Sequence, residues 1–264
     1  MQIIVCVQQA LDWNASTKDF RIDPATNEVK VSFPRYCIDQ FDEIALEVAL
    51  QYRARFGGEV RALTVGPEEA DEVLRHALAM KADHATLVRR GNNNVSTAEL
   101  LCAGVKHHGG AAIVLCGRTS SGNGTGQTGP ALAEHLGLPF IANIVHIEGG
   151  EHGWLCRRET TAGYEVLKVT TPFVASVTNA SSNIPRALAM KDVMLAHRAA
   201  MDMLDADALC PSTDATITQP LRVLRRYVPV MERSCQRIEG TPQEQARALA
   251  QYIRRCLPAP GVPA

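Results

Sequence analysis

The sequence predicts an α/β protein built on a doubly wound, mostly parallel sheet, with hairpin insertions and a C-terminal arm. Short apolar, β-branched segments recur along the first half of the chain, as expected of strands buried on both faces of a sheet. Segments with helical periodicity separate these strands, so strand and helix alternate. A glycine-rich segment follows the fourth strand, where an open sheet of this class offers its ligand site.

Composition limits the functions that this chain can have. It has 264 residues, of which 46% are hydrophobic and 21% charged, and its formal net charge is -1. A chain of this length can bury a substantial core. Its balanced charge lacks the excess of basic residues that is typical of nucleic-acid-binding proteins. The first residues carry no charged leader, and no apolar run approaches the ~18 residues of a membrane span. We expect a protein that is cytoplasmic, or inside an organelle, without membrane insertion.

The strands of the predicted sheet can be placed in order. The first strand is expected at 3–7, and segments of the same character lie at 59–65, 84–88 and 111–116. Each is short and bounded by polar or glycine residues, as buried parallel strands are. Four strands in this arrangement need a helix in each of the three connections.

Those helices are visible as amphipathic stretches. The i, i+3, i+4, i+7 spacing of a helix packed on a sheet is shown by Phe41, Ile44, Ala45, Val48, Ala49 and Tyr52. Asp39 is suited to cap this first helix, and the glycines at 57–58 are suited to end it. Segments 68–80 and 97–107 predict the next two helices.

Two hairpins are expected as insertions. Residues 20–31 alternate around a Pro/Asn turn between the first strand and the first helix. Residues 154–158 and 165–169 flank a second turn, before a strand at 173–177. Both patterns indicate antiparallel pairs attached to the parallel sheet.

The chain changes in character after residue 185. A helical patch at 187–203 precedes an irregular stretch, and an amphipathic segment spans 242–257. This tail holds too little apolar surface to form a core of its own. We therefore expect an arm that packs on its own domain or on a partner.

The glycine-rich segment 117–130 is the strongest candidate for a binding site. Glycines allow close approach of the backbone to a ligand, and the start of the helix at 131–136 offers unpaired N–H groups and a positive dipole end. Pro130 suits the first position of that helix. We favour a phosphate cradle over a flexible surface loop.

The position of this segment and the residues after it disfavour two common kinds of phosphate-binding loop. Residues 124–129 spell GxGxxG, but this fingerprint belongs to the first strand–helix turn of a dinucleotide-binding fold, and here it follows the fourth strand. No P-loop lysine follows, and no convincing nucleophile or general base is found elsewhere. The acidic pair Asp42 and Glu43 is explained by the helix dipole alone. The fold class is Rossmann-like, and the missing catalytic groups favour a binding or electron-carrying role over bond-breaking catalysis.

The order of several motifs resembles the beta subunits of electron-transfer flavoproteins, including relatives from nitrogen-fixation and carnitine operons. The resemblance covers most of the first ~200 residues, and its specificity lies in the joint order of its pieces. These are found at 3–9, 22–26, 40–47, 63–67, 77–83, 117–130, 157–159 and 185–186.

The resemblance implies an adenine-nucleotide-binding, Rossmann-like domain and a heterodimer. An electron-transfer flavoprotein alpha subunit would hold most of the FAD, and this chain would cover the flavin and bind AMP as a structural nucleotide. Electron-bifurcating members of the family bind a second FAD in place of AMP. Dehydrogenases would reduce the flavin, and the complex would pass electrons to a quinone-linked or other acceptor. Residues 1–185 would form the nucleotide-binding domain, and 186–264 the partner-docking segment and arm.

The same resemblance assigns cofactor-binding positions. Trp13 falls where the family places an aromatic residue beside the flavin. The nucleotide-binding set carried over by position is Cys6, Asp39, Gln40, Phe41, Asp42, Val65, Gly122, Asn123, Gly124, Thr125, Gly126, Gln127, Thr128 and Gly129.

The sequence departs from the family's pattern at several places. The loop has Gly122, Asn123 and Gly124 where the family usually has acidic residues, which puts contacts through those carboxylates in question. Lys81 stands where glycine is usual, at a cost of about 1 kcal/mol if its backbone is left-handed. The docking loop for dehydrogenases, at 179–183, lacks the usual apolar anchor.

Two other classes of protein share some of these sequence features. A homo-oligomeric nucleotide-binding regulator of the universal-stress type shares a similar sheet and loop, but the long arm after residue 185 argues against it. A Rossmann dehydrogenase is disfavoured by the position of its GxGxxG and by the lack of a catalytic set.

Overall fold

The computed structural model describes residues 1–12, 14, 17–91, 95–150, 152–210, 224–228 and 235–256. The chain forms two compact units. The first comprises Met1–Arg21 and Val29–Arg222, and the second comprises Ile22–Glu28 and Val223–Ala264. The sheet and its buried core lie in the first unit.

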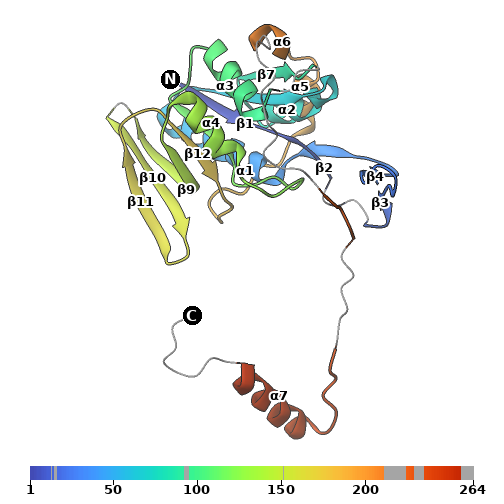
Figure 1. Ribbon diagram of the computed structural model, residues 1–264. Coiled ribbons are helices and arrows are strands. Elements are labelled where there is room, and N and C mark those ends of the chain that lie inside the picture. Colours follow the sequence, from blue (N-terminus) through green and yellow to red (C-terminus); the bar gives the residue numbers. More distant parts are fainter. Residues whose placement is uncertain are drawn as a thin grey trace. The chain divides into compact units, whose positions relative to one another are not determined.

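A sheet of nine strands organises the first unit, in the order β11-β10-β9-β12-β8-β1-β6-β7-β13 (Figure 1). β1 (Gln2–Cys6) pairs in parallel with β6 (Glu59–Gly66) on one side and β8 (Ile113–Gly117) on the other. The parallel pairing continues outward through β7 (His84–Arg89), β13 (Asp202–Asp205), β12 (Phe173–Val177) and β9 (Phe140–Gly150).

An antiparallel hairpin extends one side of this sheet. β10 (Gly153–Thr160) pairs with β9, and β11 (Gly163–Val169) pairs with β10. β11 is therefore the outermost strand on that side (Figure 1). This is the second hairpin that the sequence predicts.

Helices cover both faces of the sheet. Side chains alternate along a strand, so Ile3 and Val5 enter one buried cluster while Ile4 and Cys6 enter the other. α1 (Gln40–Phe56) and α2 (Asp71–Ala79) contribute to the first cluster. α3 (Thr97–His107) and α4 (Thr128–Leu136) contribute to the second. The result is the three-layered, doubly wound arrangement that the sequence predicts.

Shorter elements join these layers. β2 (Gln9–Leu11) pairs with β5 (Tyr36–Ile38), and β3 (Phe20–Ile22) pairs with β4 (Val29–Val31). α5 (Met190–Ala196) packs against α2 in the first unit. The bounds of the remaining short helices are η1 (Thr17–Asp19), η2 (Glu68–Ala70) and α6 (Ala206–Leu209).

The second unit combines a hairpin turn with the end of the chain. The Arg226 backbone N–H donates to Asn27 Oδ1 at 2.9 Å, and its Nη1 donates to the Asn27 carbonyl at 2.8 Å. α7 (Pro242–Cys256) is the helix of this unit, and none of its residues is buried. This helix coincides with the amphipathic segment predicted at 242–257.

The predicted fold class is confirmed, and several boundaries are sharper in the structure. The helices at 40–56 and 97–107 and the strand at 173–177 lie where the sequence places them. The single helix expected at 68–80 is divided into η2 and α2. Pro130 is the third residue of α4 and not the first, because the helix begins at Thr128. β9 and β13 are strands that the sequence analysis does not predict.

Lys81 has the left-handed backbone that its position suggested. Its φ is 87°, in a region that favours glycine. The side chain is used, because Lys81 Nζ pairs with the Asp192 carboxylate of α5. The strain at this residue therefore accompanies a contact that ties α5 to the end of α2.

No helix in the described part of the chain is long and apolar enough to cross a membrane.

Candidate functional site

A cavity of about 370 Å³ opens at the carboxyl ends of β1, β6, β7 and β8. Parallel strands share one carboxyl edge, so segments far apart in the sequence meet there. Of the nucleotide-binding positions carried over from the family, those in its lining are Cys6, Asp42, Val65, Asn123, Thr125, Gly126, Thr128 and Gly129. The structure thus brings together the strand ends and the glycine-rich loop.

Asp39 joins the first helix to the glycine-rich loop. It caps α1, as predicted, because its Oδ1 accepts the Phe41 N–H at 3.2 Å. Its Oδ2 accepts both the N–H and the hydroxyl of Ser121, each at 2.7 Å. The residue is fully buried and is not among the residues that line the cavity. Its role in the structure is to hold the loop against the helix.

Asp42 lines the cavity and joins the elements around it through hydrogen bonds. Its Oδ2 accepts the Gln8 N–H at 2.8 Å, and its Oδ1 accepts the Gly117 N–H at 2.8 Å. One carboxylate thereby links the ends of β1 and β8 to the first turn of α1. Burial, and then the nearby Asp39, raise the pKa of the Asp42 carboxyl to about 7.

Two thiols lie beside this carboxylate. Cys6 ends β1 and Cys116 lies near the end of β8, and both are buried in the cavity wall. Burial is the main cause that raises the pKa of each thiol, and the Asp42 carboxylate raises both further. The thiols stay protonated near neutral pH, so they pack as small apolar groups and not as nucleophiles.

The loop after β8 is ordered by its own side chains. Asn123 Oδ1 accepts from the Ser120 hydroxyl at 3.0 Å and from the Thr125 N–H at 3.3 Å. Gly126 has a φ of 62°, and a Cβ there would meet the Arg118 carbonyl at 2.8 Å. Only glycine suits this position without displacing the loop.

The loop leads directly into a helix. α4 begins at Thr128, in the cavity lining, so the unpaired first-turn N–H groups and the positive dipole end lie at the cavity. A Cβ on Gly129 would meet Cys116 Sγ at 2.8 Å and the Phe140 ring at 2.9 Å. The helix can approach the sheet this closely because residue 129 is glycine.

The remaining carried-over positions lie outside the lining. Gly122, Gly124 and Gln127 belong to the loop, and Gln40 and Phe41 belong to the start of α1. The Phe41 ring packs against the core below the Arg118 guanidinium, which lies 4.6 Å from the ring centre. Trp13, the position proposed beside the flavin, lies outside the described residues.

Other lining residues are not among the carried-over positions: Gly117 and Thr119 lie in the predicted segment 117–130, whereas Gln8, Arg90 and Thr97 were not anticipated from the sequence. Gln8 and Gly117 hold Asp42 through their backbone, and Arg90 and Thr97 lie at the side formed by β7 and α3. Thr119 Oγ1 is buried and finds no hydrogen-bond partner among the described residues. A buried hydroxyl left in this way is costly, and an oxygen of a ligand in the cavity would satisfy it.

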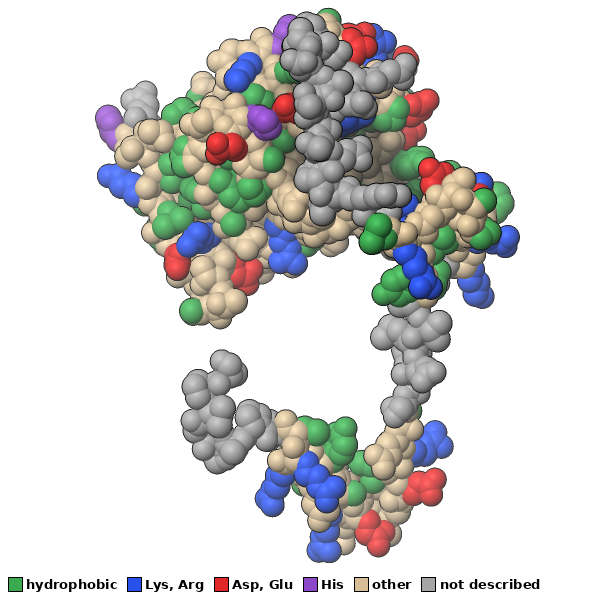
Figure 2. Space-filling model, viewed as in Figure 1, with side chains coloured by type: hydrophobic (Ala, Val, Ile, Leu, Met, Phe, Trp, Pro, Cys, Tyr) green, Lys and Arg blue, Asp and Glu red, His purple; other side chains and the backbone are tan. Residues whose placement is uncertain are grey.

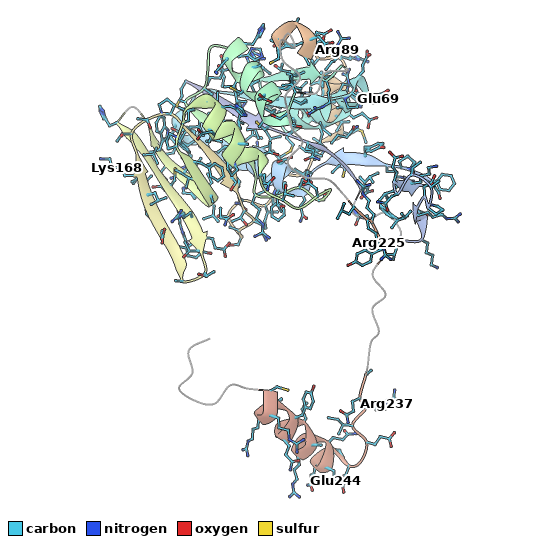
Figure 3. All side chains as sticks on the ribbon, viewed as in Figure 1. Glu69, Arg89, Lys168, Arg225, Arg237 and Glu244 are labelled. Atoms are coloured by element: carbon cyan, nitrogen blue, oxygen red, sulfur yellow. The ribbon has the colours of Figure 1, made fainter. Side chains whose placement is uncertain are left out.

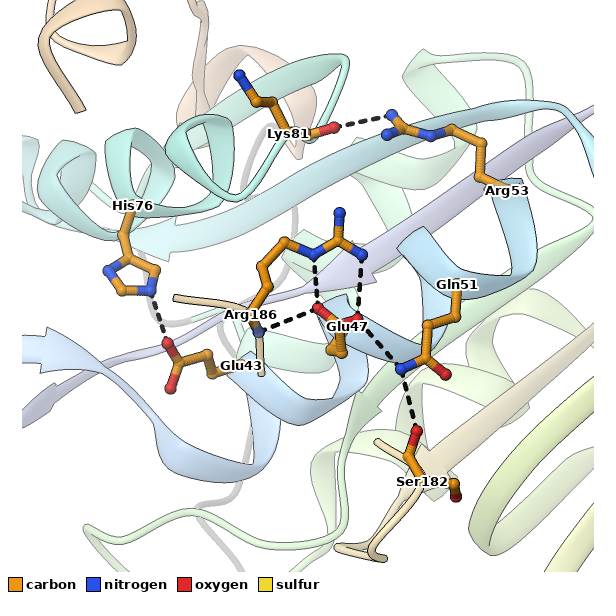
Figure 4. A network of polar contacts seen from close by, with 8 residues as sticks. All are labelled: Glu43, Glu47, Gln51, Arg53, His76, Lys81, Ser182 and Arg186. Atoms are coloured by element: carbon orange, nitrogen blue, oxygen red, sulfur yellow. Dashed lines mark hydrogen bonds and ion pairs between the residues drawn. The ribbon is translucent and has the colours of Figure 1, made fainter. Parts of the chain in front are cut away.

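A second polar network holds the segment around 182–186 on α1 (Figure 4). Arg186 donates through Nε and Nη2 to the Glu47 carboxylate, at 2.7 and 3.0 Å. Gln51 Nε2 donates to the Ser182 carbonyl at 3.0 Å and to Glu47 Oε1 at 3.1 Å. Ile184, between these fixed points, has 71% of its surface exposed.

The fold and the cavity define an α/β protein whose ligand site lies at the carboxyl edge of a parallel sheet. The family model described as the electron transfer flavoprotein domain matches residues 32–209. This chain belongs to the electron transfer flavoprotein family, and its relatives place it with the beta subunits. Its role is therefore electron transfer, in a complex that involves flavin and a partner subunit.

Three relatives illustrate the match. The electron transfer flavoprotein subunit beta of Thermoanaerobacterium thermosaccharolyticum is 30% identical over 96% of this chain and 98% of its own. The protein of the same name from Clostridium acetobutylicum is 32% identical over 78% of this chain and 79% of its own. Protein FixA of Bradyrhizobium diazoefficiens is 32% identical over 75% of this chain and 71% of its own. The comparisons favour the first of the three classes considered from the sequence.

Proposed function

We propose that the cavity binds AMP as a structural nucleotide of this subunit. The observation that carries the proposal is the cavity itself, in which the glycine-rich loop, the start of α4 and the orphaned Thr119 hydroxyl meet. Backbone N–H groups at a helix start suit a phosphate, and Val65 and Leu101 offer an apolar wall for a base. The volume of about 370 Å³ is within the range of small-ligand and cofactor sites.

We further propose that FAD is shared with the electron-transfer flavoprotein alpha subunit, which holds most of it. Trp13 would lie beside the flavin, where an aromatic ring shields the isoalloxazine from water. This chain would then contribute binding and orientation, while the flavin supplies the redox chemistry.

The same proposal extends to the redox partners. Dehydrogenases would reduce the flavin, and a quinone-linked or other acceptor would receive the electrons. The segment 179–183 would serve as the docking loop, with the exposed Ile184 beside it as the apolar contact that those five residues lack. Residues 186–264 would complete the partner-docking part of the chain.

Identification of the bound nucleotides tests the central proposal. The chain is purified alone and with the alpha-type subunit, each sample is denatured, and the released nucleotides are identified by mass spectrometry. We expect the lone chain to be colourless and to release one AMP per chain, and the heterodimer to release FAD in addition. Stoichiometric FAD from the lone chain would favour the second-FAD alternative.

The variant Gly126→Val tests whether the glycine-rich loop is part of the AMP site. We expect its AMP content to fall at least tenfold with the circular dichroism unchanged, because the added Cβ meets the Arg118 carbonyl and the φ of 62° is strained. Gly137→Val is the matched control, since Gly137 has a φ of 68° at the far end of α4 and open space around it. Equal AMP content in the two variants would remove the loop from the site.

A further inference from the structure

The glycine-rich loop contains the only Asn–Gly pair of the sequence. Asn123 is followed by Gly124, and each of the other asparagines precedes a residue that has a Cβ. The side-chain amide of an asparagine is open to attack by the backbone nitrogen of the next residue, and a Cβ on that residue hinders the approach. Gly124 removes this obstacle. Residues 121–125 are exposed, so water reaches the pair.

Hydrogen bonds hold the amide of Asn123 in a reactive arrangement. Its Oδ1 accepts the Thr125 N–H at 3.3 Å and the Ser120 hydroxyl at 3.0 Å. The first contact turns the side-chain amide toward the residues that follow it, which include the attacking nitrogen. Both donors draw electron density away from the amide carbon Cγ and stabilise the oxyanion that forms when a nitrogen attacks it. The loop therefore favours attack on this amide.

Another hydrogen bond holds the attacking nitrogen back. The Gly124 N–H donates to the Ser120 carbonyl at 3.0 Å, so this bond has to open before the nitrogen can attack. Ser120, Asn123, Thr125 and Gly126 all line the cavity. A ligand that contacts these residues keeps the loop closed, whereas an empty cavity lets it open. The rate of the reaction should therefore depend on what occupies the cavity.

We propose that Asn123 and Gly124 form a self-modification site, whose reaction marks chains that lack their nucleotide. The Gly124 nitrogen forms a bond to Asn123 Cγ, the bond from Cγ to Nδ2 breaks, and Nδ2 leaves as ammonia with the Gly124 proton. Water then opens the cyclic imide at one of its two carbonyls, which gives aspartate or isoaspartate. One water is consumed and one ammonia is released. The reaction stands by itself, and its dependence on the nucleotide rests on the function proposed above.

The isoaspartyl product disturbs the cradle. Its main chain runs through the former side-chain carbon, so the loop backbone becomes one atom longer. The loop is packed closely against its own beginning, because a Cβ on Gly126 would already meet the Arg118 carbonyl at 2.8 Å. A longer backbone before Gly126 displaces this contact, and we expect isoaspartyl chains to lose AMP.

The reaction adds a charge to an uncharged stretch. The sequence has no charged residue between positions 119 and 133. Acidic and basic side chains are interspersed over the surface of the first unit in the view of Figure 2. Those labelled in Figure 3, Glu69, Arg89 and Lys168, belong to η2, β7 and β11. Each conversion makes the net charge of the chain more negative, so ion exchange separates the product from the unmodified chain.

The test follows Asn123 in the presence and absence of the nucleotide. The lone chain is stripped of AMP with a phosphatase, which is then removed, and is incubated in mildly alkaline buffer with and without an excess of AMP. Peptide mapping by mass spectrometry measures conversion, and an isoaspartyl methyltransferase labels isoaspartate. We expect Asn123 in the stripped chain to convert about tenfold faster than Asn179, an exposed asparagine before Ala180, and AMP to slow it about tenfold. Equal conversion of Asn123 and Asn179 overturns the proposal.

The variant Gly124→Ala tests the role of the attacking nitrogen. A Cβ at residue 124 would meet Thr119 Oγ1 at 3.9 Å and the Ser120 carbonyl at 4.0 Å, which are ordinary contacts, although the φ of 65° favours glycine. We expect Asn123 in this variant to convert no faster than Asn179, and an unchanged rate overturns the proposal. If the variant does not fold, the comparison of Asn123 with Asn179 in wild type decides.

The AMP content of each sample separates this proposal from the proposed function. A chain that never binds AMP but converts Asn123 counts against the proposed function alone. Bound AMP that does not slow the conversion overturns the proposed dependence on the nucleotide. An incubated chain that is rich in isoaspartate but binds as much AMP as the fresh chain overturns the proposed effect on the cradle.

Discussion

The Asp42 carboxylate holds the ends of two strands in place. At the scale of the sequence, an acidic residue in the first turn of a helix is explained by the helix dipole. The structure gives it a different role, because its two oxygens accept the Gln8 and Gly117 N–H groups and fix the ends of two strands. It does so while buried, which disfavours its charge.

This burial predicts a pH dependence of stability. The pKa of Asp42 rises from 3.8 to about 7 in the folded chain, so its stabilising contribution is fully present below pH 3.8 and is lost as the pH rises through about 7. In Asp42→Asn this contribution is absent. Between pH 5 and 8 we expect wild type to lose up to about 3 kcal/mol more unfolding free energy than the variant. Urea unfolding at each pH measures the difference.

Asp42→Asn should also have a lower unfolding free energy than wild type at pH 5. An asparagine oxygen can serve one of the two N–H groups but not both, which costs about 1–2 kcal/mol at pH 5. Glu68→Gln is the control, because it removes an exposed carboxylate before α2. Its pH profile of unfolding free energy should be parallel to that of wild type. Parallel pH profiles for wild type and Asp42→Asn would contradict the assignment.

At the scale of elements, the sequence predicts most helices and the central strands, but it misses β9, inside the sheet, and β13, at its edge. The helix at 97–107 is bounded by a capping box between Ser96 and Glu99, which the sequence displays directly. β9 is obscured because Asn143, with a φ of 57°, interrupts its alternation at an irregular register with β12. β13 carries the residues Asp202 to Asp205, whose charges mask an edge strand.

The candidate site also contains residues that the sequence predicts and residues that it does not. The glycine-rich loop is predictable because its residues are constrained locally, by turn chemistry and by a helix start. Gln8, Thr97 and Arg90 reach the cavity only through the packing of separate elements, so no local pattern marks them. Gly117 looks like any loop glycine in the sequence, yet a Cβ there would meet Asp42 Oδ1 at 2.7 Å.

The network that holds the segment around 182–186 is an element-scale feature that can be measured. Glu47 is buried, so removal of the Arg186 guanidinium leaves its carboxylate without a cationic partner. We expect Arg186→Met to cost about 1–3 kcal/mol, and Glu47→Leu/Arg186→Met to cost less than the sum of the single changes. A double-mutant cycle by urea unfolding measures this coupling.

The chain offers a matched control for this cycle. Arg158 and Glu165 form an ion pair on the hairpin with both side chains substantially exposed. Arg158→Met should cost less than about 1 kcal/mol, because water screens an exposed pair. Equal losses at Arg186 and Arg158, or strict additivity at Glu47 and Arg186, would show that the buried pair does not fix this segment.

At the scale of the whole molecule, the first unit contains the buried core, and none of the described residues of the second unit is buried. Both buried clusters draw on residues of the first unit. α7 in the second unit exposes Leu249, Tyr252 and Ile253, which lie at the spacing of one helix face. An amphipathic helix with an open apolar face gains stability chiefly by packing on something else.

Removal of the tail after Cys210 tests this division. We expect the unfolding midpoint of the shortened chain to change by less than about 3 °C, because both clusters are retained. Association with the alpha-type subunit should weaken at least tenfold, since we propose that α7 packs its apolar face on a partner. The full-length variant Leu249→Asp/Ile253→Asp should reproduce the weaker association with no change in the midpoint. A large drop in the midpoint would instead make the tail part of the folded unit, and unchanged association of both proteins would leave α7 without a role in docking.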